Sequence, residues 1–263
     1  MKTASVLGAV LYIIYSDKAE MKSMPYISLL QLFGGDCMFK KVNIICGHYG
    51  SGKTNFSLNL AKQLSNSGKK VHIVDLDIVN PYFRTSDYKE MLEDSGIRVV
   101  SPVSAGTTLD TPFLSAEILS VFEQEDDYVI VDVGGDDVGA TALGRFEKYI
   151  KNVDDYQCIY VVNKYRKLVS NPKDAVDLMH EIEIASKLKM DVVVNNSNLS
   201  YLTTVDDILS SIDYANEVCT LSQLPLLATA VPQILSDELK GKVPNIYPVE
   251  IIVKLPWAEK GDV

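Results

Sequence analysis

Cysteine and histidine are both scarce in this sequence. The 263 residues include four cysteines and three histidines, and no two cysteines have C-x-x-C spacing. A disulfide framework and a zinc site built from these residues are therefore not expected. Sparse, unpaired cysteine is typical of proteins from a reducing compartment, so we expect a cytoplasmic protein. Cys46 and Cys158 lie in apolar runs typical of strands, where we expect them to be buried.

Basic residues are too few to give the protein a positive surface. Lysine and arginine total 25 against 35 aspartates and glutamates, which gives a formal net charge of -10 at pH 7. Such a surface repels a phosphate backbone, so direct binding of nucleic acid is not expected. The 47% hydrophobic and 23% charged content is that of an ordinary globular protein and argues against a disordered or fibrous chain.

Long apolar runs are also missing. The run VLGAVLYIIY at residues 6–15 is much shorter than the roughly 20 residues that a membrane-spanning helix needs. A secretory signal would need a small-x-small cleavage site, which the following SDKAEMKSM lacks. We favour a translation start at Met38, with residues 1–38 as an N-terminal extension, because the first strand pattern follows directly. The C-terminal VEIIVKLPWAEKGDV has a strand-like stretch but no basic amphipathic helix, so we expect no membrane association.

From residue 39 onward, short apolar segments alternate with helix-length amphipathic segments. This pattern predicts an α/β fold of three layers, in which a mostly parallel central sheet is flanked by helices. The expected strands span residues 42–46, 71–76, 98–100, 128–133, 157–163, 191–195 and 224–230. No linker rich in glycine, proline or serine divides the chain. We therefore expect one domain at 39–256 and a short C-terminal tail at 257–263.

Two predicted helices have clear start signals. Asn171-Pro172 is typical of a helix N-terminus, since proline is well suited to the first helical position. Thr204 with Asp207 three residues later predicts a capping box. The second helix is expected to run from residue 205 to about residue 218.

A glycine-rich motif stands between a predicted strand and a predicted helix. It matches G-x-x-x-x-G-K-[ST] with Gly47, His48, Tyr49, Gly50, Ser51, Gly52, Lys53 and Thr54. Glycines let such a loop curl so that backbone N–H groups point at phosphate oxygens, and the helix N-terminus adds partial positive charge. Lys53 is expected to reach the β- and γ-phosphates, and the Thr54 hydroxyl to bind Mg²⁺. The motif therefore predicts a nucleotide-binding site.

Acidic residues follow two other predicted strands. The strand YVIVDV carries Asp132 and is followed by Gly134-Gly135. Beside a phosphate-binding loop such an acid can orient a magnesium-bound water, and the glycines let a backbone N–H approach the γ-phosphate. In VDLDIVNPYFR, the spacing of Asp75 and Asp77 places both carboxylates on one side of an extended chain. The alternative for these acids is turn formation at strand ends.

With these segments the sequence resembles the ParA/MinD/CobQ-type ATPases and the nitrogenase iron protein, in the SIMIBI class of P-loop NTPases. The resemblance covers most of residues 39–256 and rests on the P-loop, the D-x-D segment and the DVGG segment. It implies that Asp77 positions the attacking water, that Asp75 supports it, and that both help Thr54 and Asp132 to order magnesium. Lys53, Asp77 and Asp132 form the expected catalytic set. The resemblance also implies a nucleotide-dependent homodimer.

The sequence departs from that family at three positions. The signature lysine that follows the first P-loop glycine, and reaches the partner's phosphates in a nucleotide-sandwich dimer, is replaced by His48. A free imidazole titrates near about 6.5, so His48 either substitutes for the lysine when protonated or is a loop residue without that role; we favour the second. Tyr49 replaces the next glycine, and Val133 replaces the proline after the strand-end acid. We therefore expect a divergent branch and not a chromosome-partitioning protein.

The expected base is adenine. Asn163-Lys164-Tyr165-Arg166 follows a predicted strand where G proteins keep N-K-x-D. Guanine recognition needs the final carboxylate as an acceptor, and Arg166 has donors only, so GTP is disfavoured. The resemblance implies adenine contacts from Asn195 and Asn196, for which the alternative is a turn. It also places Pro232 in the loop that closes over the base.

These observations predict a Mg²⁺-dependent ATP-binding protein with slow ATPase activity. Hydrolysis is expected to act as a switch on an unidentified protein partner, because the D-x-D and DVGG segments fit a switch better than a substrate pocket. A small-molecule kinase or ATP-dependent ligase is the first alternative, although the sequence lacks the arginine cluster of a kinase lid. A nucleotide-binding scaffold that does not hydrolyse is the second, and the missing signature lysine is consistent with it.

Overall fold

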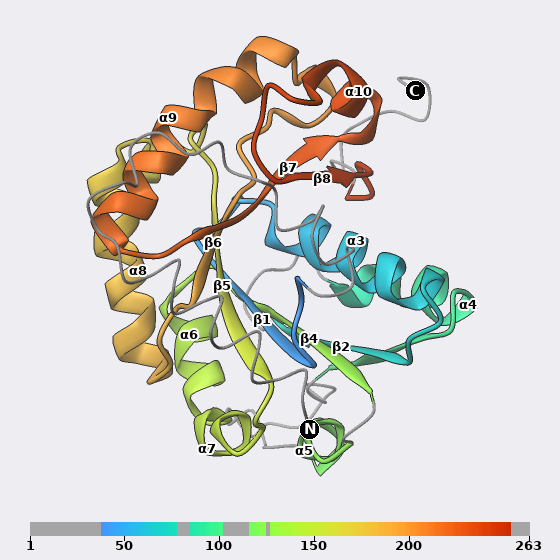
Figure 1. Cartoon of the computed structure of the whole chain (residues 1–263). Coiled ribbons are helices and arrows are strands. Elements are labelled where there is room, and N and C mark those ends of the chain that lie inside the picture. The colour runs from blue at the N-terminus through green and yellow to red at the C-terminus, as the bar shows by residue number, and fades with distance from the viewer. Residues whose placement is uncertain (1–37, 78–84, 102–115, 125–126, 254–263) are drawn as a thin grey trace, which may run out of the picture.

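The computed structural model describes residues 38–77, 85–101, 116–124 and 127–253. Within them, eight strands form one sheet in the order β3-β2-β4-β1-β5-β6-β7-β8 (Figure 1). The strands are β1 (Val42–Cys46), β2 (Val71–Leu76), β3 (Ile97–Val100), β4 (Tyr128–Val133), β5 (Tyr156–Val162), β6 (Val192–Asn195), β7 (Leu226–Pro232) and β8 (Ile246–Val249). The expectations for residues 1–37 and for the tail at 257–263 lie outside the described residues.

All neighbouring strands in this sheet run parallel. Every residue of β1 and β2 is buried, because helices cover both faces of the sheet and a strand so placed must be apolar on both sides. The predicted parallel α/β fold with three layers is confirmed.

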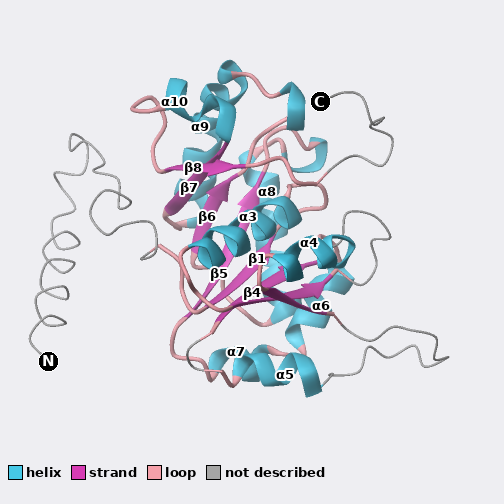
Figure 2. Ribbon diagram, turned by 90° about the vertical axis from the view of Figure 1, so that its right-hand side faces the viewer, coloured by secondary structure: helices cyan, strands magenta, loops and turns pink. Residues whose placement is uncertain are grey.

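Helices cover the two faces of the sheet unequally. The longest helix on one face is α3 (Lys53–Asn66), which packs there with α4 (Lys89–Asp94). The other face carries α5 (Ala116–Phe122), α6 (Asp137–Gly144), α7 (Glu147–Lys151), α8 (Pro172–Ser186) and α9 (Val205–Ser222). Figure 2 shows the strands enclosed between these helices. A short helix, α10 (Ser236–Leu239), and the 3-10 turns η2 (Thr85–Tyr88), η3 (Lys167–Val169), η4 (Ser200–Leu202) and η5 (Gln233–Leu235) complete the described elements.

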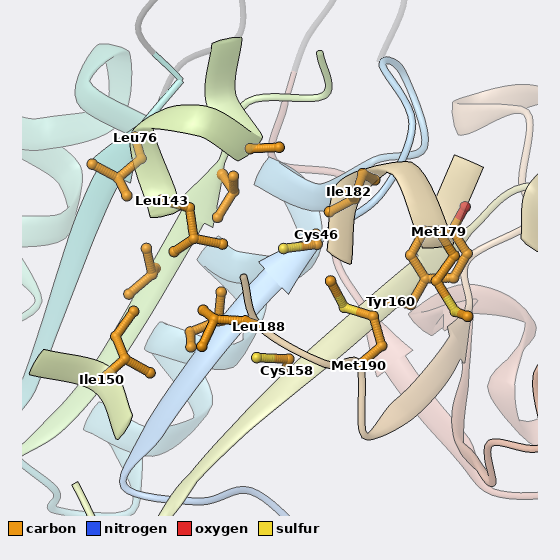
Figure 3. Close-up of a cluster of buried hydrophobic side chains, with 14 of the residues drawn as sticks. Cys46, Leu76, Leu143, Ile150, Cys158, Tyr160, Met179, Ile182, Leu188 and Met190 are labelled. Atoms are coloured by element: carbon orange, nitrogen blue, oxygen red, sulfur yellow. The ribbon is translucent and has the colours of Figure 1, made fainter. Parts of the chain in front are cut away.

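The larger hydrophobic core lies between the sheet and helices α6 to α8. Figure 3 shows Cys46, Cys158 and Tyr160 from the central strands facing side chains that come from these helices. Both cysteines are buried and unpaired, as predicted. The Tyr160 hydroxyl donates to the Ala175 carbonyl at 2.6 Å, so the polar atom in this core has a partner on α8.

The helix start signals act as their chemistry predicts. Asn171 accepts from the Lys173 N–H and caps α8, which has its proline in the first turn. Thr204 and Asp207 form a reciprocal capping box at the start of α9. The helix continues to Ser222, beyond the predicted end near residue 218.

The C-terminal edge of the sheet differs from the prediction. Strand β8 was not predicted, because its short sequence IYPV contains Pro248, which removes a backbone donor. At the sheet edge that loss is tolerated, since β8 pairs with β7 alone. The strand-like stretch expected from residue 249 instead leaves the sheet after Val249. There Asn59 and Asn55 on α3 hydrogen-bond to the backbone of residues 250–253.

None of the helices in the described residues is both long and apolar enough to cross a membrane.

Candidate nucleotide-binding site

The residues singled out from the sequence follow strands that end at one edge of the sheet. The P-loop follows β1, the D-x-D segment ends β2, and Asp132 lies in β4. Residues 163–166 follow β5, and residues 196–198 follow β6, which ends at Asn195. In a parallel sheet the carboxyl ends of neighbouring strands meet, and β1 lies between β4 and β5 in this one. The strand order therefore brings the predicted motifs together around the P-loop.

The P-loop backbone takes conformations that require glycine. Gly50 and Gly52 have φ values of 73° and 86°, in the left-handed region. At Gly47 a Cβ atom would lie 2.3 Å from the Val161 carbonyl oxygen, so a side chain there would collide with β5. Gly52 is the N-cap of α3. The loop is thus curled against the sheet and leads directly into a helix N-terminus, which is the geometry of an anion-binding site.

Lys53 is buried at the centre of the site. Its side chain is 6% exposed, and its ammonium donates to the His48 carbonyl at 3.0 Å. Burial lowers the pKa of Lys53, while the carboxylates of Asp132 and Asp77 oppose that shift. The sequence-predicted lysine therefore lies within the field of two of the predicted acids.

Asp132 receives hydrogen bonds from three surrounding hydroxyl groups. Thr85 donates to one carboxylate oxygen at 2.8 Å, and Ser57 donates to the other at 3.3 Å. Burial raises the pKa of Asp132 to about 7, with a further rise from the Asp75 carboxylate; Lys53 and hydrogen bonds from Thr54 and Thr85 oppose the shift. Thr85 and Ser57 were not predicted from the sequence.

The two acids of the D-x-D segment, Asp75 and Asp77, have different surroundings. Asp75 is the register partner of Asp132 on the neighbouring strand, and its oxygens accept from the backbone N–H groups of Asp77 and Ser86 at 3.0 and 2.9 Å. Burial raises the pKa of Asp75, although these hydrogen bonds oppose the rise. Asp77 instead approaches the loop after β4, since a Cβ at Gly134 would be 3.2 Å from its carboxylate.

The loop after β4 packs directly on the P-loop. A Cβ at Gly135 would lie 2.5 Å from the Tyr49 backbone nitrogen and 2.7 Å from the Lys53 ammonium. Asp136, next in the loop, caps α6 by accepting from the Gly139 N–H at 2.8 Å. The DVGG segment therefore lies against the P-loop lysine.

The P-loop residues that depart from the family pattern face outward. Tyr49 is 52% exposed, and a ring nitrogen of the half-buried His48 lies 2.6 Å from the Tyr49 carbonyl. Burial lowers the pKa of His48, as do Lys53 and Arg166, although the hydrogen bond opposes the shift. A lowered pKa favours the uncharged form of the ring, and the role of His48 stays a prediction.

The residues predicted at the base lie at the end of β6, directly after it, and at the end of β7. Asn196 is 1% exposed and donates to the Ser51 carbonyl of the P-loop at 2.7 Å. Asn195 is fully buried and donates to the Ser211 hydroxyl of α9 at 2.9 Å. Pro232 is the last residue of β7 and is also buried. Asn196 is thus hydrogen-bonded to the P-loop, and the role of all three residues in base binding stays a prediction.

The oxygen donors of the site suit magnesium held with a nucleotide. Thr54, Asp75 and Asp132 offer hydroxyl and carboxylate oxygens, which Mg²⁺ prefers. The described residues contain no group of three or more histidine, cysteine or acidic side chains arranged to hold a metal alone. The buried Ser51 hydroxyl has no partner within the described residues, which leaves a polar atom of the P-loop available to a ligand.

Comparison with known proteins gives one family match. The model of the CobQ/CobB/MinD/ParA nucleotide binding domain matches residues 44–205, from β1 to the start of α9. The matched segment contains the P-loop, both acidic segments and the residues that follow β5 and β6. Curated proteins provide no significant match.

Solved structures match this chain at low identity. FtsY from Mycoplasma mycoides is 16% identical, with a TM-score of 0.49 over 72% of this chain and 59% of that chain. The signal recognition particle 54 kDa protein from Aeropyrum pernix K1, in complex with GDP, is 16% identical, with a TM-score of 0.47 over 72% of this chain and 40% of that one. This chain therefore spans about three fifths of the first structure and two fifths of the second.

The family assignment rests on the matched segment. It covers more than half of the chain and includes the P-loop, its buried lysine and the neighbouring acids. The chain belongs to the CobQ/CobB/MinD/ParA nucleotide-binding domain family of P-loop NTPases.

Proposed function

We propose that the protein binds ATP with Mg²⁺, hydrolyses it slowly, and uses hydrolysis as a switch on a protein partner. The observation that carries this proposal is the contact between the loop after β4 and the P-loop, beside the buried Asp132. Thr85, just after the D-x-D loop, is bonded to Asp132, and Gly135 lies against Tyr49 and Lys53. Loops that contact the phosphate-binding lysine are placed to move when a γ-phosphate arrives or leaves.

The proposed chemistry is positioning and electrostatic stabilisation. Lys53 stabilises charge on the γ-phosphoryl group, and Asp77 orients the attacking water. Thr54 and Asp132, with Asp75 beside them, would hold the magnesium ion, which supplies charge neutralisation on the phosphates. With no second catalytic cation contributed by His48, intrinsic turnover is slow.

The proposed base is adenine because of Arg166. The position where G proteins read guanine with a carboxylate carries a side chain that only donates hydrogen bonds. We further propose that residues 39–256 form the nucleotide-binding domain, that ATP favours a homodimer, and that the protein is cytoplasmic.

Phosphate release tests the proposal. The full chain is incubated with Mg-ATP or Mg-GTP, without an added phosphoryl acceptor, beside Lys53→Ala and Lys148→Ala, an exposed lysine on α7. Release from ATP that vanishes in Lys53→Ala and persists in Lys148→Ala supports a switch ATPase.

Two other outcomes would contradict part of the proposed function. ATP binding without release points to the kinase, ligase or scaffold alternatives, and addition of candidate acceptors then separates them. Faster release from GTP than from ATP overturns the proposed base preference.

A further inference from the structure

A phosphate-binding loop must turn its carbonyl groups away from the phosphates. Its N–H groups point inward, so its carbonyl oxygens point outward and need other donors. The His48 carbonyl is satisfied within the loop, by the Lys53 ammonium at 3.0 Å and the Ser51 N–H at 3.1 Å. The Tyr49 carbonyl lies 2.6 Å from a His48 ring nitrogen of the same loop, whereas the Gly50 and Ser51 carbonyls take donors from outside it.

Side chains from two neighbouring loops supply those donors. Arg166, after β5, donates from Nε to the Gly50 carbonyl. Asn196, after β6, donates to the Ser51 carbonyl at 2.7 Å. Arg166 also lies close to the loop, since a Cβ at Gly50 would be 3.2 Å from its Nε. Two consecutive outward carbonyls of the P-loop are thus held by residues outside it.

The segment that carries Arg166 is itself anchored. The Lys164 N–H donates to the Ser197 hydroxyl at 2.9 Å, and the Lys164 ammonium donates to the Ser210 carbonyl of α9 at 2.7 Å. The Tyr165 hydroxyl donates to the Asp207 carbonyl at 2.7 Å. The backbone next to Arg166 is therefore held by the loop after β6 and by α9. The Arg166 guanidinium is directed to the P-loop.

We propose that Arg166 is a positioning residue for the P-loop. By holding the Gly50 carbonyl outward, it keeps the N–H groups of the loop arranged for phosphate before the nucleotide binds. A loop ordered in advance loses less conformational freedom on binding, so affinity rises without a contact between Arg166 and the nucleotide. The inference rests on nucleotide binding at the P-loop and adds to it a residue that acts through the loop backbone.

Nucleotide titration of the full chain tests this role. The probes are the fluorescent mant-ADP and mant-ATP with Mg²⁺, and the variants are Arg166→Ala, Arg166→Lys and Lys167→Ala. Lys167 is the matched control, because it is an exposed cation one residue away in the same segment. We expect Arg166→Ala to weaken mant-ADP and mant-ATP equally, by about tenfold, through loss of one charged hydrogen bond.

The remaining variants separate positioning from other roles. Arg166→Lys keeps a cationic donor and is expected to recover most of the affinity, whereas Lys167→Ala is expected to bind as wild type does. If Arg166→Ala fails to fold, a wild-type-like melting temperature for Arg166→Lys with intermediate affinity still supports the role.

Three results would overturn the inference. They are unchanged affinity in Arg166→Ala, an equal loss in Lys167→Ala, which would indicate a general charge effect, and a loss confined to mant-ATP, which would place Arg166 on the γ-phosphate. Absence of mant-ADP and mant-ATP binding in wild type would instead contradict the proposed function itself.

Discussion

Gly135 sets how closely the loop after β4 approaches the P-loop. A Cβ at this position would lie 2.5 Å from the Tyr49 nitrogen and 2.7 Å from the Lys53 ammonium, and the first of these atoms belongs to the backbone. The lysine end can shift cheaply, but the Tyr49 backbone is part of the P-loop. A side chain at Gly135 therefore acts on the loop that holds the phosphates.

Gly135→Ala is expected to separate the two loops. Overpacking of this kind costs about 1–3 kcal/mol, so the variant should unfold at lower urea and release phosphate from Mg-ATP more slowly than wild type. Urea unfolding followed by circular dichroism, together with a phosphate assay, measures both effects. Wild-type stability and turnover in Gly135→Ala would mean that the DVGG segment does not need this contact.

Residue patterns predicted the centre of the site but not its surroundings. The P-loop and Asp132 are visible in the sequence because each belongs to a local motif next to a strand. Thr85 and Ser57 are not, since their hydrogen bonds to Asp132 join residues 47 and 75 positions apart. A hydroxyl becomes a partner of that carboxylate only through the packing of α3 and η2 around β4.

At the scale of elements, α3 connects the P-loop to the C-terminal segment. It begins with Lys53, and Asn59 on the same helix accepts from the Glu250 N–H at 2.8 Å and donates to the Glu250 carbonyl at 2.9 Å. Asn55 accepts from the Ile252 N–H at 2.8 Å. After Val249, these side-chain amides supply backbone hydrogen bonds of the kind that a neighbouring strand supplies within the sheet.

Asn59→Ala is expected to loosen this attachment. It leaves the Glu250 N–H without its side-chain partner, at a cost of about 1–3 kcal/mol, while the Glu250 carbonyl keeps the hydrogen bond from Asn55. Denaturant unfolding should show the lower stability, and hydrogen exchange should show faster exchange of the Glu250 amide. Asn66→Ala, at the exposed end of the same helix, is the control and should change neither quantity. Equal protection of the Glu250 amide in wild type and Asn59→Ala would contradict the attachment.

The capping box of α9 gives a pH-dependent contribution to stability. Hydrogen bonds from the Thr204 hydroxyl and N–H lower the pKa of Asp207 from 3.8. A carboxylate whose folded pKa is lowered stabilises the protein above its unfolded pKa, and this contribution is lost as the pH falls through the folded pKa.

Asp207→Asn is therefore expected to be less stable than wild type at pH 7. The difference is about 0.5 kcal/mol, at the low end for helix caps because solvent screens the group. It should shrink as the pH falls below about 4, where Asp207 becomes protonated in the unfolded chain, and disappear once the pH is below the lowered pKa of the folded state. Urea unfolding of both proteins at several pH values measures the difference, and a constant difference across pH 3 to 7 would argue against a charged cap.

Local signals explain which elements the sequence predicted. Proline after asparagine and a threonine paired with an acid three positions later predicted the starts of α8 and α9, because capping needs only neighbouring residues. Strand β8 was missed because Pro248 argues against a strand unless the strand lies at an edge. Its edge position is a property of the whole sheet and is absent from the local sequence.

At the scale of the molecule, the order of the strands in the sheet determines which residues of the site are neighbours. Apolar runs separated by amphipathic segments predicted a parallel sheet flanked by helices, since that pattern follows from burial on both faces. They did not predict that β1 lies between β4 and β5. That order places β2 beside β4, and so aligns Asp75 with Asp132 across one strand pair. The neighbourhood of the acids is thus a consequence of topology.

Phosphate release by Asp77→Ala, measured beside its binding of mant-ATP, tests the central claim most directly. Asp77 is proposed to orient the attacking water, and its carboxylate lies beside Gly134 in the loop after β4. We expect Asp77→Ala to bind mant-ATP with an affinity close to that of wild type and to release no phosphate above background. Normal turnover in this variant would contradict the assignment of the water to Asp77 and, with it, the proposed hydrolytic switch.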